Sequence, residues 1–355
     1  MAINLHEKYS KNILEAFASE SLLSGKLNSD YDFVGVKTVK ISTLQTVPMN
    51  DYTRSGTNRY GTPTEMGDVV QELTLTQDKG FSLTIDKGNN ADQNGIKAAG
   101  RALKLQLKER MVPEADKYAF RRLVDLAGTV SSQTTELTKT NVEERIDAGI
   151  AVLDNAEVPQ DNRVLYVDTM TYGILKRTQT QLDASDEVKK AWGKGVIGEY
   201  GNMPVVKVPA GRWPKFVNFM IVYKNSATFP EKLNDTKIHV DPPGLSGNLL
   251  EGRHYYDCFV FGTKCMGIYV DVDARSSKGT VVATPTITAA SGAITCATTG
   301  ATIKYTTDGT DPRYSATAKV GTTSDVTTSG TVVKAYAYKA DEGVYPSAVA
   351  TATLS

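Results

Sequence analysis

The chain has 355 residues, enough for two or three domains with a substantial core. Lysine plus arginine and aspartate plus glutamate both number 40, so no charge excess points to nucleic acid, a membrane or an acidic substrate. No apolar run approaches the roughly 18 residues that span a bilayer. The cysteines Cys258, Cys265 and Cys296 match no zinc spacing and are expected to be reduced packing residues in a protein made in a cytoplasm.

The first third of the chain predicts an arm, strands and a long loop. Residues 1–32 are expected to form an arm with a short amphipathic helix. Alternating β-branched residues predict a strand at 34–47, and residues 71–86 predict two more segments around Lys79-Gly80. Between them, Pro48 to Gly67 has no apolar period, and a loop of about twenty residues is unusual inside a compact domain. It is interpreted either as a mobile surface loop or as a segment that lies on another subunit.

The longest segment with helical periodicity runs from Asn94 to Gly128. If continuous, this spine helix would be about 45–50 Å long. Asn94 can cap its start, Gly128 suits its end, and Pro113 predicts a kink or break. Apolar residues recur at the three-or-four spacing of one buried stripe, at Ile96, Ala99, Leu103, Leu107, Met111, Ala115, Tyr118 or Ala119, Leu123 and Leu126.

The region that follows mixes helices with strands, which indicates an α+β fold. Asn141 and Glu144 resemble a capping box at the start of a helix. A buried strand at 164–167 is followed by a helix that Asp168 would cap. Further elements are predicted in chain order: a helix at 186–192 and strands at 203–208, 217–223, 236–240, 255–261 and 266–272.

The composition changes near Asp273. Residues 274–283 predict a polar linker. Residues 284–355 are rich in Thr, Ala, Ser, Gly and Val, lack Trp and Phe, and predict a small antiparallel sandwich. Asp308-Gly309 and Asp311-Pro312 mark turns between its strands.

No residue constellation predicts catalysis, a cofactor or a metal. Gly193 to Gly198 matches G-x-G-x-x-G, but it follows a predicted helix and precedes a strand, so a tight turn is the better interpretation. His6, His239 and His254 are far apart in the sequence, and an isolated histidine is more often structural than a ligand. We therefore expect a protein that is not an enzyme.

The order of these elements resembles the Hong Kong 97-type fold of tailed-phage major capsid proteins. The resemblance covers residues 1 to about 273 and is carried by Arg163–Arg177, Val196–Gly211 and Glu251–Asp273. It implies four parts in chain order: an N-terminal arm (1–33), an extended loop or E-loop hairpin (34–90), the spine helix and peripheral domain (91–139), and an axial domain with the return strands of the peripheral domain (140–273).

The same resemblance implies a major capsid (head) protein that self-assembles as hexamers and pentamers into an icosahedral shell around a DNA genome. Its location would be the virion capsid, assembled in the host bacterial cytoplasm, with scaffold, portal and decoration proteins as partners and no sequence-specific nucleic-acid binding. The extended loop would lie on a neighbour, with Asp51, Arg54, Arg59 and Glu65 as candidates for intersubunit ion pairs. No lysine lies between Lys40 and Lys79, so a Lys–Asn crosslink from this loop is not expected.

The C-terminal region carries a second resemblance. Lys304–Pro312, Val332–Tyr338 and Ser347 resemble the chitobiase C-terminal-type immunoglobulin-like module, which implies a domain displayed on the outer shell surface. Three tyrosines are candidates for a surface aromatic platform making weak glycan contact, namely Tyr305, Tyr314 and Tyr345, although alternating tyrosines are more often half-buried. Deleting residues 280–355 is then expected to leave shells of normal size.

Two alternative functions fit parts of the sequence. An encapsulin-like bacterial compartment shell protein would keep the same fold and change its contents. A carbohydrate-binding surface protein would follow from the C-terminal region alone. Large particles would favour a shell, and glycan binding would favour the second alternative.

Overall fold

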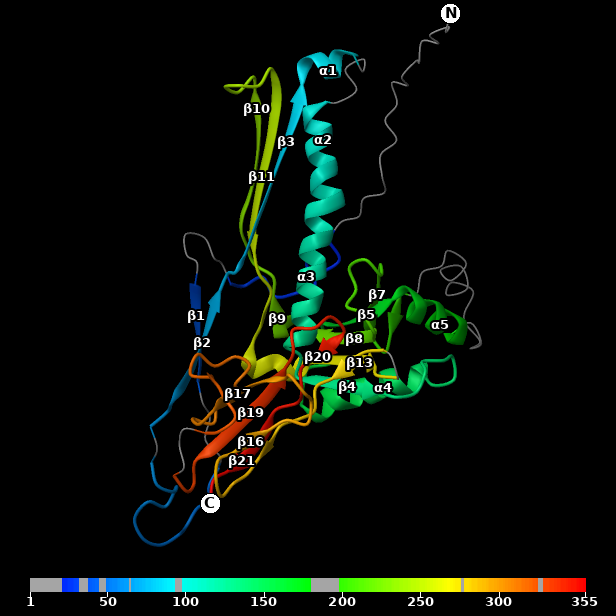
Figure 1. Cartoon of the computed structure of the whole chain (residues 1–355). Helices are drawn as coiled ribbons and strands as arrows, with labels where there is room; N and C mark the ends of the chain where they lie inside the picture. The colour runs from blue at the N-terminus through cyan, green and yellow to red at the C-terminus, as the bar shows by residue number, and fades with distance from the viewer. Residues whose placement is uncertain are drawn as a thin grey trace, which may run out of the picture.

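The computed structural model describes residues 21–31, 38–44, 49–63, 65–92, 98–179, 198–275, 278–324 and 328–355. A central body contains a mixed sheet and carries three projections: a long blade of strands beside a helix, a two-stranded hairpin, and a C-terminal all-β domain (Figure 1). The predicted N-terminal helix, the helix at 186–192 and most of the Gly193–Gly198 turn lie outside the described residues.

The central sheet has the strand order β4-β13-β8-β5-β7-β6. β5 runs parallel to β7, β13 runs parallel to β4, and β8 is antiparallel to both β5 and β13. The strands are β4 (Thr129–Gln133), β5 (Arg163–Asp168), β6 (Glu199–Tyr200), β7 (Met203–Val208), β8 (Val217–Tyr223) and β13 (Ile268–Asp273). This confirms the buried strand at 164–167 and the strands at 203–208 and 217–223.

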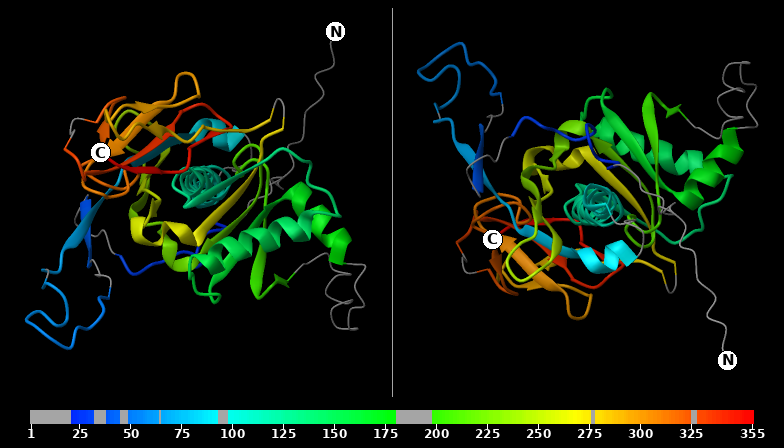
Figure 2. Two further views of the ribbon diagram at one scale, coloured as in Figure 1. Left: turned by 90° about the horizontal axis from the view of Figure 1, so that it is seen from below. Right: turned by 90° about the horizontal axis from the view of Figure 1, so that it is seen from above.

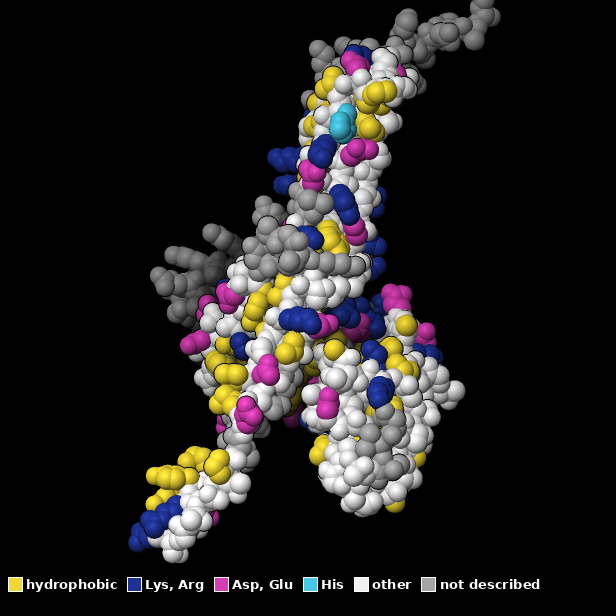
Figure 3. All heavy atoms as spheres, turned by 90° about the vertical axis from the view of Figure 1, so that its left-hand side faces the viewer, with side chains coloured by type: hydrophobic (Ala, Val, Ile, Leu, Met, Phe, Trp, Pro, Cys, Tyr) yellow, Lys and Arg dark blue, Asp and Glu magenta, His cyan; other side chains and the backbone are white. Residues whose placement is uncertain are grey.

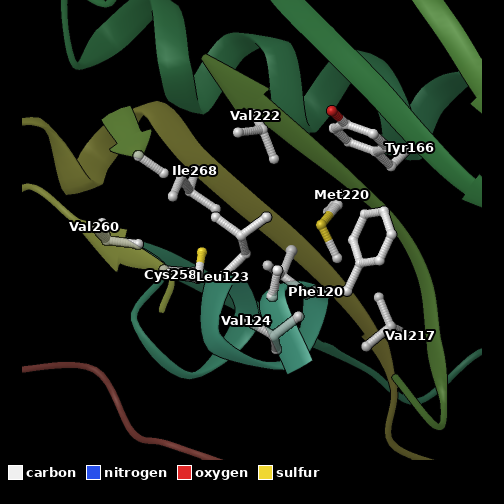
Figure 4. Close-up of a cluster of buried hydrophobic side chains, with 14 of the residues drawn as sticks. Phe120, Leu123, Val124, Tyr166, Val217, Met220, Val222, Cys258, Val260 and Ile268 are labelled. Atoms are coloured by element: carbon white, nitrogen blue, oxygen red, sulfur yellow. The ribbon is translucent and has the colours of Figure 1, made fainter. Parts of the chain in front are cut away.

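The sheet is covered on both faces, which explains why its central strands β5 and β8 are almost continuously apolar. Helix α3 (Val112–Asp125) lies on one face, where Phe120 and Leu123 meet Met220 of β8 (Figures 2 and 4). Helices α4 (Val142–Asn155) and α5 (Thr169–Gln179) cover the other face. Residues of β5 alternate between the two cores, since Tyr166 points to α3 and Leu165 points to α4.

The ends of α4 and α5 are set by different side chains. Asp168 Oδ1 accepts the backbone N–H of Thr171 at 2.6 Å, which confirms the predicted cap of α5. The capping box predicted for α4 is wrong. Asn141 makes no cap bond to the helix and instead binds backward, accepting the Thr138 N–H and donating to the Glu136 carbonyl. Asn141 therefore fixes the preceding loop.

The spine helix consists of α2 (Ala99–Gln106), a π-helical turn (Leu107–Met111) and α3. The π turn lies directly before Pro113, where the Val112 N–H reaches back to the Leu107 carbonyl. The irregularity expected at Pro113 is thus a widened turn within a continuous helix. Only the α3 part is buried, because no residue of Ala99–Met111 is buried in the described chain. The proposed Asn94 cap lies outside the described residues.

Gly128 follows the spine helix in a role other than the expected cap. Its N–H donates to the Cys265 carbonyl at 3.0 Å. A Cβ at this position would lie 2.5 Å from the Cys265 oxygen and 2.6 Å from the Met266 Cα. Gly128 is therefore required by the close approach of two backbone segments.

The blade packs beside the upper spine helix with the strand order β10-β11-β3 (Figure 1). Its strands are β3 (Gln77–Asp86), β10 (Glu231–Val240) and β11 (Gly247–Tyr256), and the short helix α1 (Lys87–Asp92) follows β3. The expected division at Lys79-Gly80 is wrong, since β3 is continuous there and the break between β2 and β3 falls at Leu75 and Thr76. The expected strand at 255–261 is also divided: β11 ends at Tyr256, and β12 (Phe259–Val260) pairs with β9 (Ala227–Thr228).

The hairpin contains β1 (Thr38–Leu44) and β2 (Asp68–Thr74), paired antiparallel from Thr38↔Thr74 to Leu44↔Asp68. We use the name protruding hairpin for β1, β2 and the described residues between them. Figure 1 shows the connecting loop extending well beyond the body.

The C-terminal domain is all-β, with its own core around Ile303, Val333 and Leu354. Its main sheet has the order β18-β17-β19-β21, and two short pairs, β14-β20 and β15-β16, complete it. The strands are β14 (Thr280–Val281), β15 (Thr286–Ile287), β16 (Ile294–Thr295), β17 (Thr302–Thr306), β18 (Lys319–Val320), β19 (Val332–Tyr338), β20 (Val344–Tyr345) and β21 (Ala350–Thr353). Because β14 pairs with β20 and Val282 is buried in this core, the expected linker at 274–283 ends earlier, before Thr280.

Candidate functional site

Several large apolar side chains of the protruding hairpin are exposed to solvent. Met49 is 99% exposed and Tyr60 is 85% exposed, and Leu44, Tyr52, Met66 and Val70 are exposed too. Figure 3 shows apolar side chains near the far end of the hairpin, beside a basic tip. A monomeric protein rarely exposes contiguous apolar surface of this kind, so the hairpin is a candidate interaction surface.

The loop of the hairpin is shaped by its own contacts. The Thr53 N–H donates to the Arg59 carbonyl at 3.0 Å, and the Gly61 N–H donates to the Asn58 carbonyl at 2.9 Å. The rings of Tyr52 and Tyr60 meet edge to face, with centroids 5.0 Å apart. These contacts give the loop a preformed shape, which lowers the entropy lost on binding a partner.

The four charged residues proposed from the sequence all lie on this loop. Asp51, Arg54, Arg59 and Glu65 are exposed, and within the described residues none of them takes part in an ion pair. Arg59 donates from Nε to the Gly56 carbonyl at 3.2 Å, which orients its guanidinium at the tip. The fold therefore presents these charges to the surroundings without bringing them together.

The root of the hairpin is firmly attached to the body. Leu73 and Leu75 are buried against Phe259 and Phe261. Asp257 accepts both the N–H and the hydroxyl of Thr76, at 2.9 and 2.7 Å, and also the Tyr118 hydroxyl of the spine helix. Burial raises the pKa of Tyr118 to about 12, so this hydroxyl remains a hydrogen-bond donor at neutral pH. Asp257 thus links hairpin and spine.

Buried ion pairs that sequence reasoning missed hold the body together. Asp116 of α3 accepts the Ser21 hydroxyl at 2.7 Å, the Leu22 N–H at 3.0 Å and Arg212 at 2.7 Å. Asp271 of β13 pairs with Arg145 of α4 and accepts the Asn218 amide. An acidic residue between Ala115 and Ala119, inside the predicted apolar stripe, was the available signal for the first pair.

The surface platform expected from three tyrosines is wrong. Tyr305 is 4% exposed in the core of the C-terminal domain, and Tyr345 is 0% exposed. Tyr314 packs against the body and donates its hydroxyl to the Leu126 carbonyl at 2.5 Å. Burial raises the pKa of Tyr314 well above its ordinary value. Alternation in short strands does not distinguish an outward face from a face that docks on another domain.

The C-terminal domain is docked on the body through these side chains. Tyr345 donates to the Lys215 carbonyl, and the guanidinium of Arg121 lies 4.7 Å above its ring. Arg121 also donates to the Val344 carbonyl at 2.8 Å, and Arg313 donates to the Ala127 carbonyl at 2.5 Å. The last contact places a cation at the C-terminal end of the spine helix, where the helix dipole favours positive charge.

Two hollows lie between these parts. A groove of about 310 Å³ separates the hairpin stem from the C-terminal domain and is lined by Leu44, Val70 and Tyr314. A second cavity, of about 240 Å³, lies between blade and spine. It is lined by His254, which is 3% exposed, stacks on Tyr256 and makes no hydrogen bond within the described chain. Its Nε2 lies 3.5 Å from a carboxylate oxygen of Glu231, and neither ring nitrogen makes a hydrogen bond to a described residue, so His254 is not the satisfied structural histidine expected from the sequence.

The described residues contain no cluster of His, Cys, Asp and Glu that could hold a metal ion. In the same residues, no helix is both long and apolar enough to cross a membrane.

A mixed sheet between a spine helix and two shorter helices, with a blade and a protruding hairpin, defines a fold seen in phage capsids. A chain of Mycobacterium phage Che8 superposes with a TM-score of 0.65 and 17% identity, over 78% of this chain and 100% of that one. The capsid of cyanophage P-SCSP1u superposes with a TM-score of 0.63 and 12% identity, over 77% of this chain and 94% of that one. The mature capsid of bacteriophage PhiM1 superposes with a TM-score of 0.61 and 10% identity, over 77% of this chain and 93% of that one. No protein-family model and no curated protein matches the sequence.

Proposed function

We propose that this chain is the major capsid protein of a tailed bacteriophage, with the Hong Kong 97-type fold. In this proposal it is a structural protein that self-assembles as hexamers and pentamers into an icosahedral shell around the DNA genome. The observation that carries the proposal is the apolar surface of the protruding hairpin, which has no covering partner within the described chain. The fold shared with the capsids of cyanophage P-SCSP1u and bacteriophage PhiM1 supports it.

The protruding hairpin would make its contacts on a neighbouring subunit. Met49 and Tyr60 would be buried there, and fully burying a large apolar side chain stabilises by about 1.5–3 kcal/mol. The loop charges Asp51, Arg54, Arg59 and Glu65 would add intersubunit ion pairs of about 0–1 kcal/mol each where they stay exposed. The apolar contacts would thus supply most of the affinity, and the charges would set the register.

We also propose that residues 280–355 form an immunoglobulin-like domain on the outer surface of the shell. The strand pairing β17-β19-β21 and the Asp308-Gly309 turn, with Gly309 at a φ of 76°, agree with such a module. The compared phage chains leave about a fifth of this chain uncovered, which matches the share that this domain occupies. A neutral domain on the outside would not compete with packaged DNA for interior volume.

The test is the assembly state of the purified full-length chain. Sedimentation velocity and electron microscopy should detect large particles, or rings of five and six subunits. The double substitution Met49→Ser and Tyr60→Ser should raise the concentration needed for assembly at least about tenfold, because two apolar contacts are lost. Met170→Ser, which changes an exposed methionine on α5, is the matched control and should assemble normally. A chain that stays monomeric at every concentration would refute the proposal.

A further inference from the structure

One segment of the body is held from three sides. Residues 257–267, which contain β12 and the 3₁₀ turn Gly262–Gly267, are called the connector segment below. The hairpin stem holds it through Gln71, whose side chain donates to the Val260 carbonyl and accepts the Gly262 N–H, both at 2.9 Å. The end of the spine helix holds it through the Gly128 N–H, which donates to the Cys265 carbonyl.

The third side of the connector segment is covered by the C-terminal domain. The ring of Tyr314 lies over Gly262 so closely that a Cβ there would be 3.0 Å from it. Arg313 donates to the Cys265 sulfur at 3.7 Å and to the Ala127 carbonyl at 2.5 Å. The segment is therefore clamped between this domain and the spine.

Arg313 and Tyr314 lie on a loop, residues 308–317, that is held by hydrogen bonds between its own residues. Arg313 is oriented by Asp311, with the guanidinium 2.8 Å from the carboxylate. Asp308 accepts the N–H and hydroxyl of Thr310 and the hydroxyl of Thr317. Hydrogen bonds within the loop reduce the conformational entropy that it loses on docking. Such a loop can transmit the position of its domain to the residues that it touches.

We propose that the C-terminal domain is an intramolecular brace for the protruding hairpin. By clamping the connector segment, Arg313 and Tyr314 hold the residues to which Gln71 is bonded, and so fix the root of the hairpin. They are positioning residues for the hairpin. The consequence for assembly rests on the proposed shell function, whereas the brace itself is a property of the single chain.

The experiment measures hydrogen exchange in the full-length protein. In Tyr314→Ala and in Arg313→Gln, amides of residues 68–76 should exchange about tenfold faster, since one or two contacts of the clamp are lost. Amides of β19, inside the C-terminal domain, should keep their protection. The matched control is Glu342→Gln, which breaks the exposed ion pair between Lys215 and Glu342 without touching the connector segment. It should leave residues 68–76 unchanged.

Unchanged exchange at residues 68–76 in both variants, with β19 still protected, would overturn the brace. If Tyr314→Ala loosens β19 itself, Arg313→Gln alone decides, and no acceleration at residues 68–76 is then the refuting result. A different result would count against the shell proposal alone. In that case the wild-type protein forms no particles, although residues 68–76 exchange faster in the two variants. If the wild type forms particles and the variants show unchanged exchange at residues 68–76, the brace proposal is refuted and the shell proposal stands.

Discussion

Buried charge in this protein is placed where separate elements must meet. Asp116 of the spine helix binds Ser21, within the stretch expected to form the N-terminal arm, and also Arg212, and Asp271 joins β13 to Arg145 of α4. A buried pair contributes little against an apolar replacement, yet losing one partner costs about 3–5 kcal/mol because the other charge stays buried. These pairs therefore specify which elements meet more than they add to stability.

The reactivity of the cysteines tests the burial of individual side chains. Cys258 is fully buried, which raises the pKa of its thiol to about 12, and burial also raises the pKa of Cys265. Thiolate is the reactive species, so at pH 8 the Cys258 thiol stays almost entirely protonated and unreactive. A maleimide reagent should modify half-buried Cys296 first in the native protein. Peptide mass spectrometry checks this, and modification of Cys258 as fast as Cys296 would contradict the burial.

The raised thiol pKa also gives a direction for stability against pH. Above about pH 8.5 the unfolded chain loses thiol protons that the folded chain keeps. The unfolded state therefore gains free energy of ionisation as pH rises, and this contribution lowers the free energy of unfolding.

At the scale of elements, glycine-to-alanine substitutions distinguish a glycine required by close backbone contact from a glycine that only weakens a helix. Gly128→Ala should lower the free energy of unfolding by about 1–3 kcal/mol, because the new methyl group would meet the backbone of Cys265 and Met266. Gly173→Ala, in the middle of α5 with open space around it, should raise the free energy by about 0.5–1 kcal/mol. Urea unfolding of both variants measures the difference. Equal effects would mean that the Gly128 contact is not close.

Local sequence patterns predicted those elements that are determined by residues close together in the chain. The buried strand at β5 and the cap by Asp168 are confirmed, whereas the predicted stripe of the spine helix is buried only in α3, at Ala115, Ala119 and Leu123. The stripe could not show that only its α3 part is buried, because periodicity gives a face and not the length over which that face is covered. Likewise, the break between β2 and β3 is where Thr76 binds Asp257, which is far away in the sequence.

The candidate site was predictable in position and not in its detail. A long loop without an apolar period indicated a segment that leaves the body, and the exposed Met49 and Tyr60 lie on it. The contacts that fix its root could not be predicted, since Gln71, Val260 and Gly262 come together only through the tertiary fold.

At the scale of the whole molecule, docking changes the expected result of a truncation. The sequence suggested that shells of normal size would still form after deletion of residues 280–355. However, Tyr345 is buried in the main core, and Tyr314 and Arg313 satisfy carbonyls at the end of the spine helix. A chain ending at Arg275 should therefore melt at a lower temperature and aggregate, because it loses apolar burial worth about 1.5–3 kcal/mol per large side chain.

Differential scanning fluorimetry and sedimentation of the truncated chain check this expectation. Tyr345→Phe in the full-length protein is the matched control, since it removes only the bond to the Lys215 carbonyl. A truncated chain with an unchanged melting temperature that still forms particles of normal size would show the C-terminal domain to be dispensable.

The fixed attachment of the C-terminal domain has a practical outcome for display. Ser355 follows β21 closely and donates its N–H to the Ala289 carbonyl, so the last residue is tied to the domain. A foreign peptide fused after Ser355 would inherit the orientation set by Tyr314 and Tyr345. In the proposed shell, with this domain on the outer surface, copies of such an antigen would stand at regular spacing with a common tilt, which favours bivalent engagement by antibodies over attachment through a flexible linker.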